Sequence, residues 1–191
     1  YASMMMDEDK GLWSHSYWVN AKRAFPKKDL FWGRGNGWVV CGFPMILDNV
    51  GLEHEESAQI IELFVKTSEA LLSCMNEDYT FNTLLKYKSY RELSATALIS
   101  AGWLHGIRCG YLDKKYLEPA VKAFEACVNA IEENENGVYM PNISGPPIPL
   151  PIFPKLGYKM IPLGKNWSYG IAALIFAAIE YKKCLSRNDR K

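Results

Sequence analysis

The alternation of two kinds of helical pattern constrains the fold of this chain more than any other feature. Residues 57–75 and 118–132 each carry one apolar stripe at helical spacing with charged residues opposite, which is typical of a helix covered on one side. Residues 38–47, 92–110 and 168–181 are apolar nearly all round and rich in Ala, Gly and Ser, as expected of helices covered on every side. The order along the chain is therefore inner, outer, inner, outer, inner, with no strand pattern of any length between the helices.

This order predicts an all-α fold built of stacked αα-hairpins, with one layer of helices inside another. An α/α barrel or toroid, or a part of one, is the leading architecture. Pro44 lies inside the first inner pattern, where we expect a kink or a helix break because proline deletes a helical hydrogen bond. Residues 133–167 hold most of the chain's ten prolines and show no helical period, which predicts a long extended excursion. Such a segment either shapes a pocket at one rim or simply wraps the surface.

Composition limits the classes of partner. The chain has 191 residues, of which 49% are apolar and 23% charged, so we expect one globular domain over residues 1–191. A formal net charge of +1 provides no broad field for nucleic acid, and no apolar run reaches the roughly 18 residues that span a bilayer. We therefore expect no nucleic-acid partner and no membrane span. The compartment is left open, as cytoplasmic or periplasmic if the source is bacterial.

Residues 31–38, "FWGRGNGW", form the most unusual motif. Its three glycines relax the backbone, and Asn36 is a suitable N-cap for a helix that begins just after it, so Arg34 is expected immediately before a helix N-terminus. A guanidinium beside that positive helix end suits a carboxylate, sulfate or phosphate, while Trp32 and Trp38 offer flat faces on which sugars stack. The spacing fits neither nucleotide-binding fingerprint. In the simpler interpretation, Trp38 belongs to the core and Arg34 forms a surface salt bridge.

A second aromatic cluster surrounds His15 in "DEDKGLWSHSYWVN". A lone histidine there is either a packed, hydrogen-bonded residue or a ligand contact, and nothing nearby indicates a catalytic serine. His54 and His105 stand alone, and the five cysteines are widely spaced, so free thiols are expected rather than disulfides or metal ligands. We predict no metal and no cofactor. Glu92 opens an inner helix, where a capping role is the simplest assignment.

Three stretches together resemble known enzymes: "GLWSHSYW", "FWGRGNGW" and "YRELSATALISAGWLHGIRCGYLDKKYLEPAVKAFE". At these separations they are similar to glycoside hydrolase families 88 and 105, the unsaturated glucuronyl and rhamnogalacturonyl hydrolases, of which the second is the closer match. The resemblance covers nearly the whole chain. It implies an (α/α)6 barrel of six hairpins and a metal-free hydration of the C4–C5 double bond of a terminal unsaturated uronic acid. Such sugars arise when polysaccharide lyases cleave substrates such as pectin.

The resemblance also implies roles for particular residues. His15 matches the family's substrate-contacting histidine, Trp32 and Trp38 match its pocket indoles, and Arg34 matches its pocket arginine. The family's catalytic acid/base is an aspartate well upstream of the histidine loop, whereas only fourteen residues precede His15 here. The catalytic residue is therefore unknown, and we expect the domain to correspond to the C-terminal half of the family, incomplete at the N-terminus.

Half a barrel would expose the apolar faces of its inner helices. We therefore expect self-association or a second chain that supplies the missing half-barrel. The leading hypothesis is a glycosidase that releases an unsaturated galacturonyl or glucuronyl residue from lyase-generated oligosaccharides. The alternatives are a non-catalytic carbohydrate-binding α/α domain that lacks the catalytic aspartate, and a structural helical-repeat protein with no sugar site.

Overall fold

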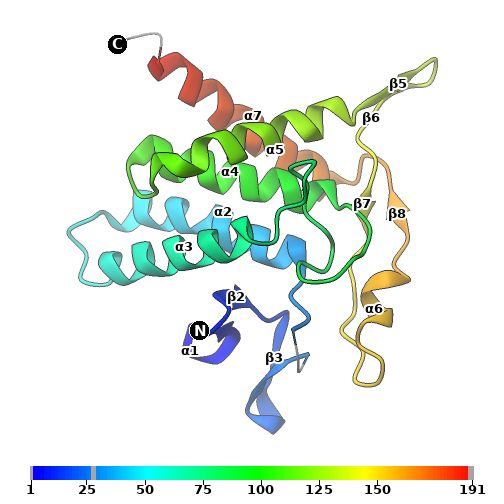
Figure 1. The fold of residues 1–191 in the computed structure, drawn as a ribbon, viewed down its shortest axis with the longest axis horizontal. Coiled ribbons are helices and arrows are strands. Elements are labelled where there is room, and N and C mark those ends of the chain that lie inside the picture. The colour runs from blue at the N-terminus through cyan, green and yellow to red at the C-terminus, as the bar shows by residue number, and fades with distance from the viewer. Residues whose placement is uncertain (1, 27–28, 189–191) are drawn as a thin grey trace.

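Five long helices form the body of the chain in the computed structural model, which describes residues 2–26 and 29–188 (Figure 1). They are α2 (Gly33–Val50), α3 (Ser57–Leu72), α4 (Leu93–Cys109), α5 (Leu117–Asn129) and α7 (Ser168–Asn188). α4 lies in the middle and packs against both α2 and α7, while α3 packs on α2 and α5 packs on α4 and α7. The predicted order of inner and outer helices is confirmed.

The central helix is enclosed along almost its whole length. Every residue of α4 from Leu93 to Gly106 is buried, which explains a pattern that is apolar nearly all round. Its Trp103 is fully buried against Phe81 and Tyr116, with ring centroids 6.0 and 5.5 Å away. Phe64 of α3 reaches Gly106, where an added Cβ would lie 2.4 Å from its ring. One continuous core thus ties α4 to the outer helix α3.

The first inner helix begins earlier than its sequence predicts. Trp32, not Asn36, is the N-cap, and Gly33 opens the helix with its N–H donated to the carbonyl of Thr83 at 2.8 Å. That backbone partner satisfies one of the orphan donors at the start of the helix, and no side chain caps it. The predicted cap at Asn36 and the helix start just after it are therefore wrong. Arg34 lies inside the first turn rather than before it.

Pro44 does not break α2, which continues to Val50. Proline deprives the carbonyl four residues earlier, that of Val40, of its helical donor. This carbonyl lies against Gly102 of α4, where an added Cβ would be 2.5 Å from the oxygen. The missing hydrogen bond thus falls at a close approach of the two inner helices, where α2 packs on α4.

The remaining elements are short. They comprise α1 (Ala2–Met5), α6 (Leu156–Lys159), the 3-10 turns η1 (Val19–Ala21) and η2 (Lys114–Tyr116), and four antiparallel pairs: β1 (Met6–Asp7) with β2 (Leu12–Trp13), β3 (Ser16–Trp18) with β4 (Arg23–Phe25), β5 (Glu132–Asn134) with β6 (Gly137–Tyr139), and β7 (Ile143–Ser144) with β8 (Leu163–Gly164). The proline-rich excursion over residues 133–167 is mostly extended, as predicted, but carries the β5–β6 and β7–β8 pairs and α6. The strand pairs are too short to show an alternating pattern in the sequence.

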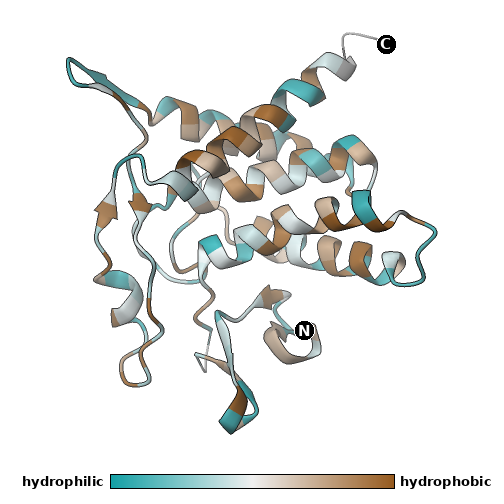
Figure 2. Ribbon diagram, turned by 180° about the vertical axis from the view of Figure 1, so that it is seen from behind, coloured by the Kyte–Doolittle hydropathy of each residue, from teal (hydrophilic) through white to brown (hydrophobic). Residues whose placement is uncertain are grey.

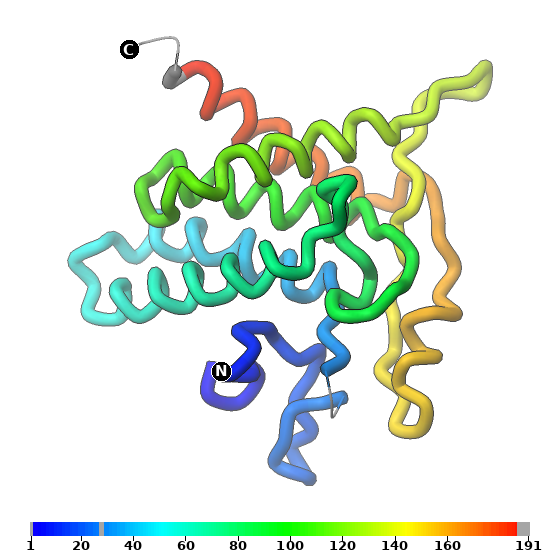
Figure 3. The backbone as a smooth tube through the Cα atoms, viewed as in Figure 1, coloured from blue at the N-terminus to red at the C-terminus, as the bar shows by residue number. Residues whose placement is uncertain are grey.

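The excursion and the N-terminal segment lie at neighbouring edges of the helical layers. In Figure 3 the β3–β4 region and the segment around α6 run next to each other, outside the helices. Figure 2, seen from behind, shows hydrophobic residues along α7, and Ile175 and Ile179 of this helix are exposed.

The five cysteines are free thiols, as predicted. No helix in the described ranges has the length and apolar content needed to cross a bilayer.

Two glycine substitutions test the contact between the inner helices. Gly102→Ala should lower the free energy of unfolding by about 1–3 kcal/mol, because the new methyl group meets the backbone of Val40 rather than a flexible side chain. Gly42→Ala is the matched control: it lies in α2 with nothing within 4 Å of the added Cβ, and should stabilise by up to about 1 kcal/mol. Urea unfolding measures both. Equal effects of the two substitutions would contradict the close approach.

Candidate functional site

Arg34 lies at the centre of the candidate site and is buried, with 3% of its surface exposed. Its Nη1 donates to Oε1 of Glu92 at 3.1 Å and to the carbonyl and hydroxyl of Ser144 at 2.7 and 3.0 Å. Its Nη2 donates to the carbonyl of Gly145 at 3.0 Å. The guanidinium is therefore held by acceptors at the start of α4, in β7 and immediately after β7.

Two aromatic rings complete the surroundings of this guanidinium. Its Cζ lies 4.8 Å from the ring centroid of Trp32 and 4.6 Å from that of Tyr169, in the first turn of α7. Both contacts are cation–π interactions, which are strongest where water is excluded. The Tyr169 hydroxyl donates to the carbonyl of Ser144 at 2.7 Å, so the same strand orients the ring. Trp32 is thus positioned by the arginine beside it.

Glu92 is the counterion and is completely buried. It caps α4 as predicted, since its Oε2 accepts from the backbone N–H of Ala95 at 2.6 Å. Its Oε1 accepts from the Ser94 hydroxyl, from the backbone N–H of Ser144 and from Arg34. One carboxylate therefore closes a helix end and neutralises a buried cation, which full hydrogen bonding makes tolerable.

These contacts change the interpretation of the motif. The sequence predicts a cationic fork open to an anion, or in the simpler interpretation a surface salt bridge. The structure shows a buried ion pair instead, because the acceptors of Arg34 come from 58 and 110 residues away in the chain. Trp38, one turn further along α2 on the face of Arg34, is 42% exposed, so its placement in the core is also wrong.

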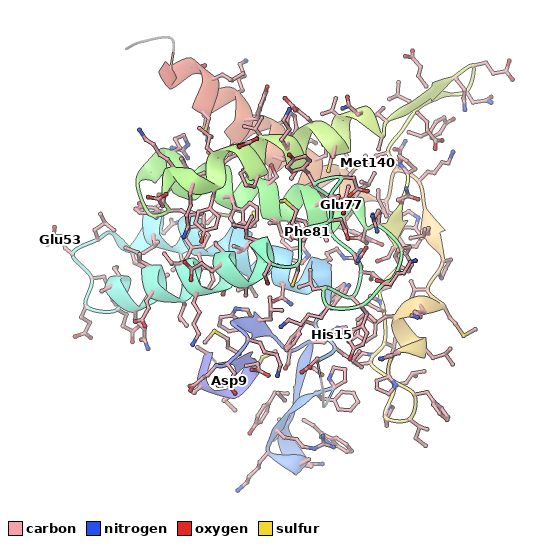
Figure 4. The ribbon with its side chains drawn as sticks, viewed as in Figure 1. Asp9, His15, Glu53, Glu77, Phe81 and Met140 are labelled. Carbon is pink, nitrogen blue, oxygen red and sulfur yellow. The ribbon has the colours of Figure 1, made fainter. Side chains whose placement is uncertain are left out.

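His15 stacks on Trp32. Their ring centroids are 4.5 Å apart with an interplanar angle of 25°, and Nδ1 of His15 lies 2.8 Å from the hydroxyl of Tyr158. Burial lowers the pKa of His15 below its ordinary value, and the positive charge of Arg34 lowers it further. The imidazole is therefore neutral at neutral pH. Figure 4 shows His15 between the β3–β4 hairpin and the segment that carries α6.

Asn36 holds the histidine loop against α2. Its Oδ1 accepts from the backbone N–H of Trp13 at 2.8 Å, and its Nδ2 donates to the carbonyls of Trp13 and Trp32, each at 3.0 Å. The Trp13 indole donates to the Thr67 hydroxyl of α3 at 3.0 Å. The amide in the motif is therefore a clamp between two segments, not a helix cap, and it places His15 over Trp32.

Of the four predicted site residues, the structure brings three into contact: His15 touches Trp32, and Trp32 touches Arg34. The sequence did not single out Ser144, Tyr158 or Tyr169. All three follow the amphipathic region, in or after the extended excursion. No local motif marks these three residues. They come close to Arg34 and His15 only when the excursion folds back onto residues 31–38.

One group of side chains in the described ranges could hold a metal ion. Asp48, His105 and Cys109 offer ligand atoms that lie within 4.8 Å of one another. The sequence predicts no metal, and it treats His105 as isolated although Cys109 follows it by one helical turn. Nε2 of His105 lies 2.7 Å from Oδ2 of Asp48, and the Tyr111 hydroxyl donates to Oδ1 of Asp48 at 2.9 Å. These bonds satisfy the carboxylate within the protein, and the group lies at the other end of α2 from Arg34.

The sequence matches the profile of Glycosyl Hydrolase Family 88 over residues 1–185. A curated relative from Alteromonas sp. (strain LOR), an unsaturated 3S-rhamnoglycuronyl hydrolase, is 28% identical over 155 residues, which cover 79% of this chain and 35% of the relative. The chain thus spans about a third of the length of that protein.

Solved structures match the fold. A possible member of the GH105 family from Klebsiella pneumoniae superposes with a TM-score of 0.83 and 27% identity, covering 94% of this chain and 46% of that one. A family 105 glycoside hydrolase from C. acetobutylicum gives a TM-score of 0.84 at 22% identity, covering 95% and 55%. The helical layers therefore correspond to about half of an (α/α)6 barrel.

The buried ion pair makes a prediction about stability. Glu92→Gln keeps the shape of the side chain but leaves the Arg34 cation buried without a counterion, so the free energy of unfolding should fall by about 3–5 kcal/mol. Glu69→Gln is the control, because Glu69 pairs with Lys115 at the surface, where solvent screens the charges, and its loss should change stability little. Urea denaturation measures the free energy of unfolding of both variants. A loss in Glu92→Gln no greater than in the control would contradict a tightly coupled pair.

His15 makes a prediction about pH. Since its folded-state pKa lies below the ordinary 6.5, the unfolded chain binds more protons around that pH, and stability should decline as pH falls below about 6.5. The decline should level off below the folded-state pKa. An NMR titration of the His15 ring should give a midpoint under 6.5, and His15→Gln should show a shallower fall in stability between about pH 7 and pH 5. A midpoint above 6.5 would contradict the burial of the ring.

Proposed function

Because this chain belongs to Glycosyl Hydrolase Family 88, we propose that it forms part of a glycosidase acting on lyase-generated oligosaccharides. The enzyme releases a terminal unsaturated galacturonyl or glucuronyl residue by adding water across the C4–C5 double bond. His15, Trp32, Arg34 and Trp38 belong to the substrate-binding site in this proposal. Membership in the family and the contact of His15 with Trp32 support it.

The stack of His15 on Trp32 is the observation that carries the proposal. The imidazole is neutral and Nδ1 is occupied by Tyr158, whereas Nε2 has no hydrogen-bond partner within the described ranges. The indole Nε1 of Trp32 is buried and also lacks a partner there. A buried polar group without a partner calls for an explanation, and beside the stacked His15 ring a ligand hydroxyl is the one we propose. A sugar ring offers both hydroxyl oxygens and apolar faces.

Arg34 and Trp38 have different parts in this site. The guanidinium is already paired with Glu92, so it acts mainly by holding Trp32 in place. The exposed indole of Trp38 is free to stack against an apolar face of the substrate. Recognition of the sugar therefore depends on aromatic faces and on hydrogen bonds from His15 and Trp32 more than on a direct salt bridge to Arg34.

Hydration of the double bond requires a proton donor whose pKa is close to the working pH. Two carboxyl groups are buried in the described ranges, those of Glu92 and Glu180. Glu92 is bound to Arg34, and the pKa of Glu180 is lowered by hydrogen bonds from Arg108 and Lys183, although burial opposes this. Neither group suits a proton donor. We therefore place the catalytic acid outside these residues, as the family's upstream aspartate implies.

The inner layer offers a surface for the remaining hairpins of the barrel. A cavity of about 270 Å³ lies over α4 between α2 and α7, with Cys41 and Ala101 at its floor and Met45 and Ile179 at its walls. Five of its eight lining residues are apolar, and His105, Glu180 and Lys183 complete the lining, so it offers the inner faces of further helices a mainly apolar surface with polar groups at one side. In this proposal a preceding segment, a second chain or a second copy covers it. The competing possibility, a carbohydrate-binding domain without catalysis, draws support from the fact that both buried carboxyl groups of the described ranges are already paired with cations.

Titration calorimetry with an unsaturated uronyl disaccharide tests the proposal. The wild-type chain should bind it, and Trp38→Ala should weaken binding about tenfold, which corresponds to about 1.4 kcal/mol of lost stacking. Val128→Ala, which removes an exposed apolar side chain from the outer helix α5, should leave binding unchanged.

Turnover is followed by loss of the ultraviolet absorbance of the unsaturated uronate, with the chain alone and with the chain joined to an upstream half-barrel from a family 105 relative. Turnover by the joined protein supports the glycosidase. Binding without turnover in both forms supports the non-catalytic domain, and no binding of any unsaturated disaccharide overturns a sugar site altogether.

A further inference from the structure

A second group of polar side chains lies at the opposite end of the two inner helices from Arg34 and Glu92. Asp48 is in the last turn of α2, and His105 and Cys109 are in the last two turns of α4. Their ligand atoms, a carboxylate oxygen, a ring nitrogen and a sulfur, all lie within 4.8 Å of one another. Three different metal-binding side chains therefore meet at one place.

The helices bring these three side chains together. His105 and Cys109 are four residues apart, so they lie one turn apart on the same face of α4. Asp48 reaches them from α2, with its Oδ2 2.7 Å from Nε2 of His105. Because His105 is buried where α2 packs on α4, the backbone under the group is rigid before any ligand arrives.

Tyr111 supports the carboxylate from the other side. Its hydroxyl donates to Oδ1 of Asp48 at 2.9 Å, which leaves Oδ2 to face His105. Gly110 ends α4 in the left-handed region, with φ of 82°, and turns the chain back so that the backbone N–H of Tyr111 donates to the carbonyl of Gly106 at 2.8 Å. Metal-binding carboxylates commonly carry such an outer hydrogen bond, which fixes their orientation.

The charges at this end of the helices favour a divalent cation. With Cys109 bound as a thiolate, it and Asp48 contribute two negative charges, which balance one divalent ion. Glu180 pairs with both Arg108 and Lys183, at 2.6 and 2.7 Å, so these cations are directed at Glu180. The last turns of α2 and α4 also present the negative ends of two helix dipoles, which attract positive charge.

The donor set is one that zinc prefers. Zn²⁺ binds imidazole nitrogen, thiolate and carboxylate at about 2.0–2.3 Å in a tetrahedral arrangement, which places the donors about 3.3–3.6 Å apart. The separations of up to 4.8 Å seen here reach that arrangement through side-chain movements of about 1 Å. Asp48 is exposed, and the cavity over α4 reaches His105, so an ion and a water molecule have access to the group.

We propose that Asp48, His105 and Cys109 form a zinc site whose fourth position is taken by water. The ion joins the last turns of α2 and α4, as the pair of Arg34 and Glu92 joins their first turns. The thiol proton of Cys109 passes to the solvent when the ion binds. The site stabilises the packing of the inner helices and takes no part in the proposed sugar chemistry, so the two proposals stand or fall separately.

Cobalt absorption tests the site in the chain without an affinity tag. Four-coordinate Co²⁺ has intense visible bands, and a thiolate ligand adds a charge-transfer band in the near ultraviolet. We expect one Co²⁺ per chain with both kinds of band, and added Zn²⁺ should displace it. Zn²⁺ should also raise Tm increasingly with its free concentration, because it binds the folded chain.

Substitutions assign the ligands. Asp48→Asn, His105→Gln and Cys109→Ser should each weaken Zn²⁺ binding by about a hundredfold or more, and Cys109→Ser should abolish the thiolate band. Tyr111→Phe removes only the outer hydrogen bond and should weaken binding about tenfold. Asp48 is exposed, so Asp48→Asn remains informative if His105→Gln fails to fold.

Two matched variants serve as controls. His54→Gln replaces an exposed histidine between α2 and α3, and Cys74→Ser replaces a half-buried thiol outside the group. Both should bind Zn²⁺ as the wild type does. The absence of a thiolate band in the wild type, or Zn²⁺ binding that is unchanged in the three ligand variants, would overturn the zinc site.

The same proteins separate this proposal from the glycosidase. Cys109→Ser should bind the unsaturated uronyl disaccharide with the affinity of the wild type, because the group lies at the far end of α2 from Arg34. Loss of sugar binding together with zinc binding in this variant would contradict a site that acts on helix packing alone.

Discussion

The buried pair of Arg34 and Glu92 is the interaction on which the rest of this structure depends. It joins the first turn of α2 to the first turn of α4, and through Ser144 and Gly145 it attaches the extended excursion to both. Burying two charges is costly, so such a pair contributes less to net stability than to the choice of one arrangement. In the alignment seen here, both the guanidinium and the carboxylate find hydrogen-bond partners. We therefore expect the pair to favour this register of the two inner helices.

The candidate site is a consequence of that register. Trp32 lies over the guanidinium, His15 lies over Trp32, and Tyr158 bonds to His15, so each ring is positioned by the group beneath it. This stack of side chains begins on the helices, whose backbone is rigid. It ends on the β3–β4 hairpin and the excursion, whose sequences can differ without disturbing the helical body. Asn36 fixes the position of the loop that carries His15, because it forms hydrogen bonds with the backbone N–H and carbonyl of Trp13.

Local patterns predicted the helical body, because a helix buried on one side shows an apolar stripe and a helix buried on every side is apolar nearly all round. Glu92 was predicted correctly as a cap for the same reason, since a cap acts within three residues. The fate of Arg34 could not be inferred in this way: its acceptors are brought to it by helix packing and by the return of the excursion. Asn36 shows the same limit, because a residue type suited to capping was instead used by a segment 23 residues away. The carbonyl that Pro44 deprives of its donor lies against Gly102, and this proximity is a property of two helices together that the pattern of one helix does not contain.

The cations around the site differ in whether a carboxylate neutralises them. Within the motif the positive charge of Arg34 is matched by a buried carboxylate, and the pair presents little net charge to a ligand. Arg23 and Lys155, by contrast, lie outside the motif and form no ion pair with a carboxylate in the described ranges. The motif that first suggests anion binding therefore builds an aromatic platform, because its guanidinium is already neutralised by Glu92.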